Sequence, residues 1–557
     1  MYLRRSRGRG GNVSLSRSWR GEQTRPFTTS HQPRIPRSNT TALPSVALPS
    51  RRHFHDYFVT HLPSSSLHPD SRSSGLHHKL PRAASTPHTS SQPGPSPAAA
   101  PPMTGPSREL TVVRIPLRSA KHHFGVSVSR GSRAYNEDTY QAGTIDIPAF
   151  ARRAPITLSR SGKGEGEGKA ADGASGDPQV FYFGVFDGHG GNECSDFLRE
   201  RLHAYVERAA GEFGLGSSLR RDAAVKATRD AEGSSDRQED GKTHKAELER
   251  ALVARWKETV GGYFRRFKPQ YFSTSTSMGE QPSEGPASIE EVLMYAFLQA
   301  DLDFVTAQAR KPDPDNQTDK PLNADDILGE PAHLNLARNW IGGPARFLGG
   351  STASAALIST PTPTPFWHPA SASSLIAAHV GDTRLLLCDT ATGVAKPLTT
   401  NHHPSSPVEG TRLRRYATTF VTDSFGEERM SGLANTRAFG DMRSKRIGVS
   451  AEPDIIRVEL APAEYSFLVL VSDGVSGTLT DQEIVDVVKE AKTPEQGARD
   501  VVSFATEVSK EGDNATCLVV RLGGWERRSE GGMGSLGTRE VRDFKQREAL
   551  DPRRGRT

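Results

Sequence analysis

Phe181–Gly191 reads FYFGVFDGHGG, an apolar run that stops at an aspartate followed by glycines and a histidine. A run this short, bounded by turn residues, predicts a buried strand with Asp187 at its end. The pattern recurs twice: Phe467–Val471 leads into Ser-Asp-Gly, and Leu375–Val380 leads into Gly-Asp. The chain therefore contains at least three predicted strands that each carry an acidic residue at their end.

Amphipathic helices separate these strands. Their predicted starts are Gly191, the capping boxes at 288–291 and 480–483, and Thr493 with the proline that follows it. After the first start, Cys194, Leu198, Leu202 and Tyr205 recur on one face of a helix. The interior of the protein is therefore predicted to be mixed α and β.

Acidic residues stand at the ends and turns of the predicted strands. They are Asp138, Asp187, Asp382, Asp473 and Asp513. Strands that end at a common edge would bring these carboxylates together, and without a cation the crowded acids would repel one another. Carboxylate oxygens without thiolates suit Mg²⁺ or Mn²⁺. Because a single Asp-Gly is most often an ordinary β-turn, the prediction of a metal site depends on the whole set.

The ordered series of motifs is more specific than any one of them. It runs RAYNED at 133–138, DGHGG at 187–191, GGSTAS at 349–354, VGDTR at 380–384, ANTRAFGD at 434–441, VSDG at 471–474 and GDNAT at 512–516. This series resembles the metal-dependent protein phosphatase 2C family over roughly residues 110–522. The resemblance implies an α+β fold, a four-layer α/β/β/α sandwich of two antiparallel sheets flanked by helices. It also implies hydrolysis of phosphoserine and phosphothreonine in proteins, with two Mg²⁺ or Mn²⁺ ions and a position for a third.

The resemblance further implies roles for individual residues. The metal positions fall on Glu137, Asp138, Asp187, Gly188, Asp382, Asp473 and Asp513. Asp187 would bridge two ions, and Asp382 corresponds to an acid linked to the third, weaker position. Water activated between two cations would attack phosphorus in line, with no phosphoenzyme intermediate. Arg133 would pair with phosphate oxygens through its planar guanidinium, and His189 would give a proton to the leaving alkoxide.

The sequence departs from the family pattern in three places. Gly477 stands where the family usually has an acid, Asn401-His402 replaces the usual Asp-His pair, and the stretch Glu409–Met430, beside the cleft in the family, is unfamiliar. Two alternatives remain beside the phosphatase. One is a catalytically weak phosphatase-like module that regulates a partner or binds phosphoproteins, and the other is a metalloenzyme acting on small phosphate esters.

The net charge of +6 arises from the N-terminal leader. Residues 1–107 hold 14 basic residues against three acids, a net of +11, which leaves −5 for residues 108–557. The folded part is therefore not expected to bind nucleic acid. The first 20 residues are rich in Arg and Ser and contain no acid, which is typical of organellar import sequences. We expect a mitochondrial protein, in the matrix or the intermembrane space, with a merely basic disordered tail as the alternative.

Composition divides the chain into four segments. They are a mitochondrial targeting leader at 1–50, a low-complexity linker with a short aromatic segment at 51–107, a phosphatase-2C-like catalytic domain at 108–522, and a disordered charged tail at 523–557. Within the catalytic domain, the polar or charged stretches 161–179, 215–249 and 311–331 are predicted to be flexible insertions.

The remaining composition limits the class of protein. The longest aliphatic run, near Phe467–Val471, is far too short to cross a bilayer, which excludes an integral membrane protein. The three scattered cysteines, Cys194, Cys388 and Cys517, indicate a reducing compartment. We expect a monomer that acts on phosphoproteins, and the resemblance to mitochondrial family members points to the pyruvate dehydrogenase complex as one such substrate.

Overall fold

The computed structural model describes part of the chain. The described residues are 57–63, 110–116, 123–152, 177–219, 235–272, 287–311, 341–414, 420–422, 428–430, 432–509, 512–528 and 534–550. The chain divides into two units, Met1–Arg52 and His53–Thr557, and every described residue belongs to the second. The predicted leader and most of the insertions at 161–179 and 311–331 lie outside the described residues.

Two antiparallel sheets form the centre of the fold. The first has the strand order β13-β7-β6-β5-β4, with β12 paired to β6, and the second has the order β3-β15-β14-β8-β9. The first sheet consists of β4 (Thr139–Ile145), β5 (Val180–His189), β6 (Gly350–Ser359), β7 (Ser373–Val380), β12 (Phe439–Gly440) and β13 (Asp454–Leu460). The second consists of β3 (Phe124–Ser129), β8 (Arg384–Asp389), β9 (Ala395–Pro397), β14 (Tyr465–Val471) and β15 (Ala515–Arg521). All three strands predicted from apolar runs are confirmed, as β5, β7 and β14.

Alternate residues of β5 belong to different cores, because successive side chains of a strand point to opposite faces. Phe181, Phe183 and Val185 lie in the cluster between the two sheets, whereas Tyr182 and Phe186 pack in the cluster that includes helix residues. The central strand β14 alternates in the same way. Both faces of these strands are buried, which is why they read as continuous apolar runs in the sequence.

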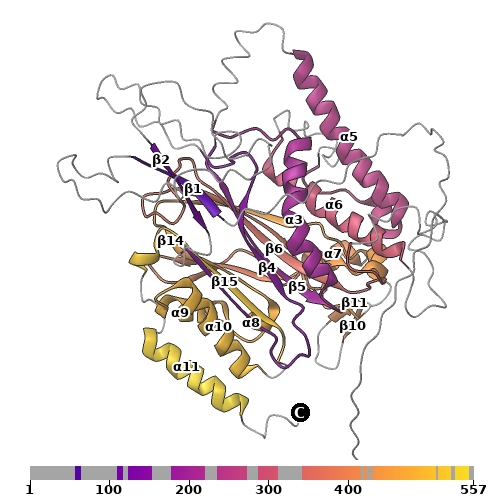
Figure 1. The fold of residues 1–557 in the computed structure, drawn as a ribbon. Helices are drawn as coiled ribbons and strands as arrows, with labels where there is room; N and C mark the ends of the chain where they lie inside the picture. Colours follow the sequence, from indigo (N-terminus) through magenta and orange to yellow (C-terminus); the bar gives the residue numbers. More distant parts are fainter. Residues whose placement is uncertain are drawn as a thin grey trace, which may run out of the picture. The chain divides into compact units, whose positions relative to one another are not determined.

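Helices cover the outer face of each sheet (Figure 1). On the first sheet these are α3 (Glu193–Glu212), α5 (Ser235–Thr259) and α6 (Ile289–Ala309), with the 3-10 helix η1 (Gly262–Arg266). On the second they are α8 (Asp473–Ser476), α9 (Asp481–Glu490) and α10 (Pro494–Val508), with η5 (Trp525–Arg527) and α11 (Gly534–Ala549). The described part of the chain is thus the predicted four-layer α/β/β/α sandwich.

Three of the four predicted helix starts are confirmed at their caps, and the fourth helix, α3, begins at Glu193 without a side-chain cap. At Ser288 and at Thr480 the side chain accepts the backbone N–H three residues later, and the glutamate there bonds back to the backbone, completing both capping boxes. Thr493 accepts the N–H of Gln496 in the same way. These caps fix where α6, α9 and α10 begin.

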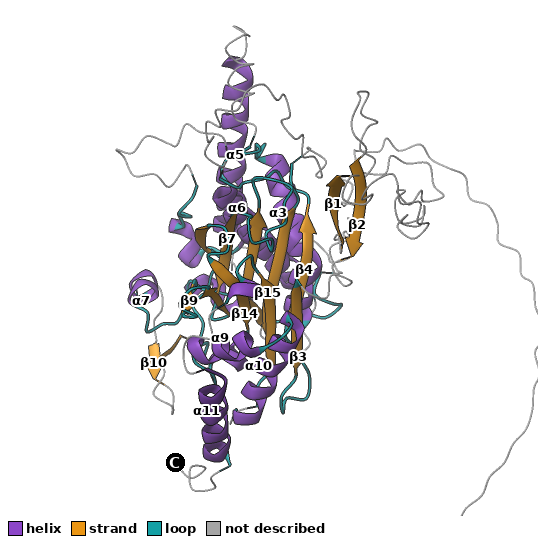
Figure 2. Ribbon diagram, turned by 90° about the vertical axis from the view of Figure 1, so that its left-hand side faces the viewer, coloured by secondary structure: helices purple, strands orange, loops and turns teal. Residues whose placement is uncertain are grey.

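Smaller elements lie between β9 and β13 along the chain. They are α7 (Pro407–Leu413), the hairpin of β10 (Phe420–Thr422) and β11 (Glu428–Met430), and η4 (Met442–Ile447). Figures 1 and 2 both show α7 close to β10. This region contains the unfamiliar stretch Glu409–Met430.

The prediction of a disordered tail at 523–557 is wrong for its described part. Trp525 is buried against Phe467, and α11 packs on α9 and α10. Ion pairs of Arg542 with Glu507 and of Lys545 with Glu483 join α11 to these helices. A helix that is attached mainly by charges lacks the apolar stripe from which helices are recognised in a sequence.

Two other predictions of flexible chain need correction. Residues 235–249 of the insertion at 215–249 form the first part of α5, where Lys245 pairs with Glu291 of α6. In the predicted linker at 51–107, β1 (Tyr57–Pro63) pairs with β2 (Leu110–Pro116). None of the helices in the described ranges combines the length and the apolar character that crossing a bilayer requires.

Candidate metal centre and active site

Three aspartates from separate parts of the chain meet at the edge of the sandwich. Asp187 belongs to β5 of the first sheet, Asp473 follows β14 of the second, and Asp382 lies in the turn between β7 and β8, which joins the two sheets. One carboxylate oxygen from each lies within 4.8 Å of the others. The sequence prediction that distant acids converge is therefore confirmed for these three.

The glycines after Asp187 and Asp473 do not serve β-turns. They leave room for other backbone segments to pass close by. A Cβ atom at Gly188 would lie 2.5 Å from the carbonyl oxygen of Glu137, and one at Gly474 would lie 1.9 Å from that of Asn514. Any larger residue would push these segments apart. The two Asp-Gly pairs thus bring the aspartates against the loops that carry the other acids.

Burial raises the pKa values of all three aspartates, and the charges of neighbouring acids add to it at Asp187 and Asp473. The pKa of Asp187 lies well above its usual value because of burial and the nearby charges of Asp473, Asp138 and Asp382. Burial and the charges of Asp382 and Asp513 raise the pKa of Asp473 to about 7. Burial likewise raises the pKa of Asp382. Carboxyl groups in this state resist ionisation unless a cation compensates them.

Asp138 lies directly behind this cluster and is only 4% exposed. Its Oδ2 accepts hydrogen bonds from the hydroxyls of Ser472 and Thr516, each at 2.7 Å. No described residue donates an N–H or O–H to Oδ1. Burial raises the pKa of Asp138 to about 6.

Glu137 and Asp513, the remaining acids of the predicted set, are not among the three whose carboxylate oxygens come within 4.8 Å of one another. The backbone of Glu137 is fixed at both ends: its N–H donates to Asn514 Oδ1 (2.7 Å) and its carbonyl accepts from Ser195 Oγ (2.6 Å). Asp513 Oδ2 pairs with the Arg133 guanidinium at 2.8 Å. The Arg133 side chain is 56% exposed, so it lies where a phosphate arriving from solvent could reach it.

His189 follows Asp187 by two residues on the same strand. Its Nε2 lies 3.0 Å from both carboxylate oxygens of Asp441. Burial lowers the pKa of His189, but the hydrogen bond to Asp441 and its negative charge outweigh that effect, and the pKa lies above its usual value. The imidazole therefore keeps its proton to higher pH than a free histidine, as a proton donor requires.

The structure includes three site residues that the sequence analysis did not single out. Asp441 closes the ANTRAFGD motif with a left-handed φ of 43°, a strained conformation of the kind that clusters at functional sites. Asn435, in the same motif, donates from Nδ2 to Asp382 Oδ2 at 2.9 Å. Asn514, in GDNAT, fixes the loop of Glu137: its side-chain Oδ1 accepts the backbone N–H of Glu137. The motifs contained all three residues, but their contacts depend on the folded chain.

The residues of the cluster fit a divalent cation. Asp187, Asp382 and Asp473 offer hard oxygen ligands, and Asp138 Oδ1 is an orphaned buried oxygen in the described part of the chain. Among the departures, Gly477 lies at the exposed end of α8, where its N–H caps the Asp473 carbonyl. It therefore contributes no side chain to the cluster.

The fold and the site together define a class of protein: an α/β/β/α sandwich that carries a cluster of carboxylates at one edge. The family model of protein phosphatase 2C matches residues 314–514. The chain is 31% identical over 419 residues to protein phosphatase 2C homolog 4 of Schizosaccharomyces pombe, which covers 75% of this chain and 84% of that protein. The chain therefore belongs to the protein phosphatase 2C family.

Other relatives match shorter stretches. A protein phosphatase 1K of Xenopus laevis, whose name describes it as mitochondrial, is 36% identical over 152 residues, 27% of this chain and 40% of that protein. The solved serine-threonine phosphatase 2C of Toxoplasma gondii is similar at 16% identity and a TM-score of 0.40, over 72% of this chain and 94% of that one. At the level of the family, the activity is metal-dependent hydrolysis of phosphoserine and phosphothreonine, with Mg²⁺ or Mn²⁺.

Proposed function

We propose that this protein is an active metal-dependent serine/threonine protein phosphatase. The observation that carries the proposal is the meeting of Asp187, Asp382 and Asp473 in one cluster of a chain that belongs to the protein phosphatase 2C family. Asp138, Glu137, Asp513 and the carbonyl of Gly188 would complete the ligands, directly or through water. Two divalent cations held there would supply an activated water as nucleophile near neutral pH.

The side chains around the cluster would perform the remaining steps. Arg133, already paired with Asp513, would turn its planar guanidinium to two oxygens of the substrate phosphate. His189 would pass its proton to the departing serine or threonine oxygen, a strongly basic leaving group. Asp441 holds the ring through Nε2, so the proton would leave from a histidine that this acid orients and keeps charged.

The experiment that tests the proposal is hydrolysis of a phosphothreonine peptide by the purified full-length protein with Mn²⁺. We expect turnover that EDTA abolishes and added Mn²⁺ restores, with little hydrolysis of phosphotyrosine or a free nucleotide. Asp187→Asn serves as the inactive control. Turnover that survives EDTA, or that favours the nucleotide, would contradict the proposal and favour a small-molecule metalloenzyme.

A regulatory phosphoprotein-binding module is the second candidate, and Gly477 is the observation in its favour. The missing acid would weaken one cation position, and a weakened site could bind phosphoproteins without cleaving them. The cluster of Asp187, Asp382 and Asp473 argues for activity. Retention of a phosphothreonine peptide by the Mn²⁺-loaded protein without release of phosphate would support the module.

We further propose that the enzyme acts in mitochondria as a monomer, on substrates such as phosphoserine in the pyruvate dehydrogenase complex. The Arg-rich leader at 1–50 and the name of the Xenopus relative support this placement. Deleting residues 2–50 should leave Mn²⁺-dependent turnover intact and move the protein to the cytosol. Unchanged localisation of the shortened protein would exclude the leader as an import signal.

A further inference from the structure

Asn435 is the one neighbour of the carboxylate cluster that donates a side-chain amide to Asp382 in the described part of the chain. Its Nδ2 lies 2.9 Å from Asp382 Oδ2. Among the described residues, none donates a hydrogen bond to the other oxygen of this carboxylate, the buried Oδ1. Only the amide nitrogen can face a carboxylate oxygen, since the amide oxygen is an acceptor. One oxygen of Asp382 is therefore bound by the protein, and the other is left for a cation.

A single residue, His402, holds both partners of this contact. Its ring Nδ1 accepts the N–H of Gly381, the residue before Asp382, at 2.9 Å. Its carbonyl accepts the backbone N–H of Thr436, the residue after Asn435, at 2.8 Å. The backbone on each side of the pair is thus tied to the same point.

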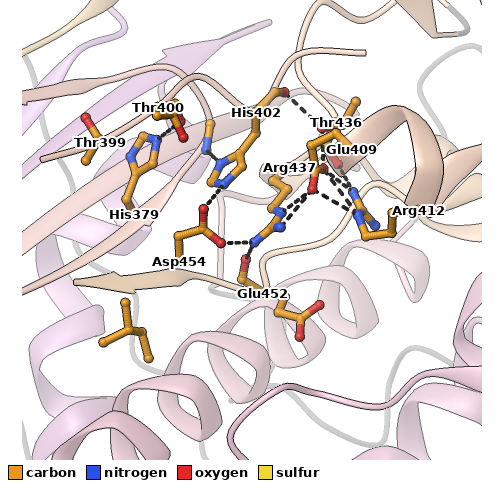
Figure 3. A network of polar contacts seen from close by, with 12 residues as sticks. His379, Thr399, Thr400, His402, Glu409, Arg412, Thr436, Arg437, Glu452 and Asp454 are labelled. Atoms are coloured by element: carbon orange, nitrogen blue, oxygen red, sulfur yellow. Dashed lines mark hydrogen bonds and ion pairs between the residues drawn. The ribbon is translucent and has the colours of Figure 1, made fainter. Parts of the chain in front are cut away.

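His402 is in turn fixed by charged neighbours (Figure 3). Because Nδ1 accepts a hydrogen bond, Nε2 carries the ring hydrogen and donates it to Asp454 at 3.0 Å. Asp454 pairs with Arg437 at 2.8 Å, and Arg437 pairs with Glu409 of α7 at 2.7 Å. An unbroken series of hydrogen bonds and ion pairs therefore joins α7 to the turn that carries Asp382.

We propose that Asn435 is a positioning residue of the cation site: it binds one oxygen of Asp382 so that the other is aimed at the cations. The inference rests on the proposed metal-dependent function. Hydrogen bonds of this kind orient a ligating carboxylate, and their loss typically costs about 10–100-fold in metal affinity. In this chain Gly477 supplies no further acid, which makes the orientation of Asp382 more important.

The test is the Mn²⁺ binding isotherm of the full-length protein, measured by titration calorimetry without substrate. Asn435→Leu keeps the branched shape and removes the donor, and we expect its weakest Mn²⁺ dissociation constant to rise by about 10–100-fold. Asn435→Asp replaces the donor with a second acid beside Asp382. It should bind Mn²⁺ more tightly than Asn435→Leu and melt at a lower temperature than the wild type in EDTA, because only a cation can compensate the added charge.

Asn401→Ala is the matched control, since it removes an exposed amide beside His402 that makes no hydrogen bond in the described part of the chain. It should bind Mn²⁺ as the wild type does. An Asn435→Leu isotherm equal to that of the wild type would overturn the inference, because a space-filling role alone predicts that result. If Asn435→Leu does not fold, the nearly isosteric Asn435→Asp decides the question: a melting temperature in EDTA equal to that of the wild type would overturn the inference. Wild-type protein that binds no Mn²⁺ would instead refute the proposed function.

Discussion

Two of the regions where the described chain shields carboxylates from solvent treat them in opposite ways. In the acid cluster, Asp187 faces Asp382 and Asp473, and repulsion adds to burial in raising its pKa. Near α7, Glu409 is only 1% exposed, yet burial there is outweighed by two arginines, which hold its pKa well below its usual value.

The α7 network carries its own compensation. Glu409 pairs with Arg412 at 2.6 Å and with Arg437 at 2.7 Å, and Thr436 donates a further hydrogen bond to it. Each charge has a partner, so the network needs no added ion. Among the described residues, no lysine or arginine pairs with Asp187, Asp382 or Asp473, so under the proposed function cations would supply the compensating charge. The difference separates a region that stabilises the fold from one that, under the proposed function, would bind metal at a cost in stability.

The largest effect that would test this contrast is expected from Asp187→Asn. The variant removes the acid in contact with the other members of the cluster, and we expect turnover of a phosphothreonine peptide to fall by on the order of 10³-fold or more. In EDTA the same variant should melt at a higher temperature than the wild type, since one repelling buried charge is gone. A metal-free variant less stable than the wild type would mean that the cluster is not under repulsion.

Glu409→Gln should change stability in the opposite direction. Removing this charge leaves Arg412 and Arg437 buried side by side, and breaking a buried pair typically costs about 3–5 kcal/mol. Denaturant unfolding in EDTA measures the loss. Arg499→Ala, which removes a surface pair with Glu495, is the control and should change stability by less than about 1 kcal/mol. Equal losses in the two variants would show that burial of the α7 network is unimportant.

The sequence predicted the cluster better than the network. Asp187 directly follows an apolar run and Asp473 follows one after a single serine, so local pattern alone places both at strand ends. The network joins α7 to residues after β11 and at the start of β13. Hydrophobic periodicity in the sequence does not predict where α7 lies. Glu409, first in an unfamiliar stretch, gave no sign of being buried, because sequence patterns treat an isolated acid as solvent-exposed.

The partner of His189 was missed for a similar reason. Asp441 is brought to the imidazole by the two-residue strand β12, which pairs with β6. A strand that short has no recognisable period. The motif ANTRAFGD predicted that the segment matters, but only the pairing of β12 with β6 shows which acid meets the histidine.

Titration offers a third test, smaller in effect. Asp138 and Asp473 have pKa values of about 6 and about 7 in the folded protein, above the roughly 3.9 of an unfolded aspartate. The folded state therefore binds more protons than the unfolded chain, and metal-free stability should fall as pH rises from about 4 to about 7. Mn²⁺ binds the ionised carboxylates, so the rise in melting temperature that it causes should grow over the same interval.

Thermal melts with Mn²⁺ and with EDTA at each pH measure this dependence. Glu409→Gln is the matched control: its melting temperatures should all be lower, but the gain from Mn²⁺ should grow with pH as in the wild type. A gain that does not depend on pH would mean that the cluster is already ionised without metal.

The smallest effect is expected at His189, the histidine that follows Asp187 on β5. Asp441 raises the pKa of His189 through a hydrogen bond and its charge, so the protonated imidazole persists to higher pH. Asp441→Asn removes the charge, lowers that pKa, and should move the alkaline limb of the pH–rate profile for a phosphoserine peptide to lower pH. An aryl phosphate, whose leaving group needs no proton, is the control and should keep its profile. A shift of both profiles together would place the effect of Asp441 on the cations rather than on His189, and no shift in either would remove His189 from the proton-donor role.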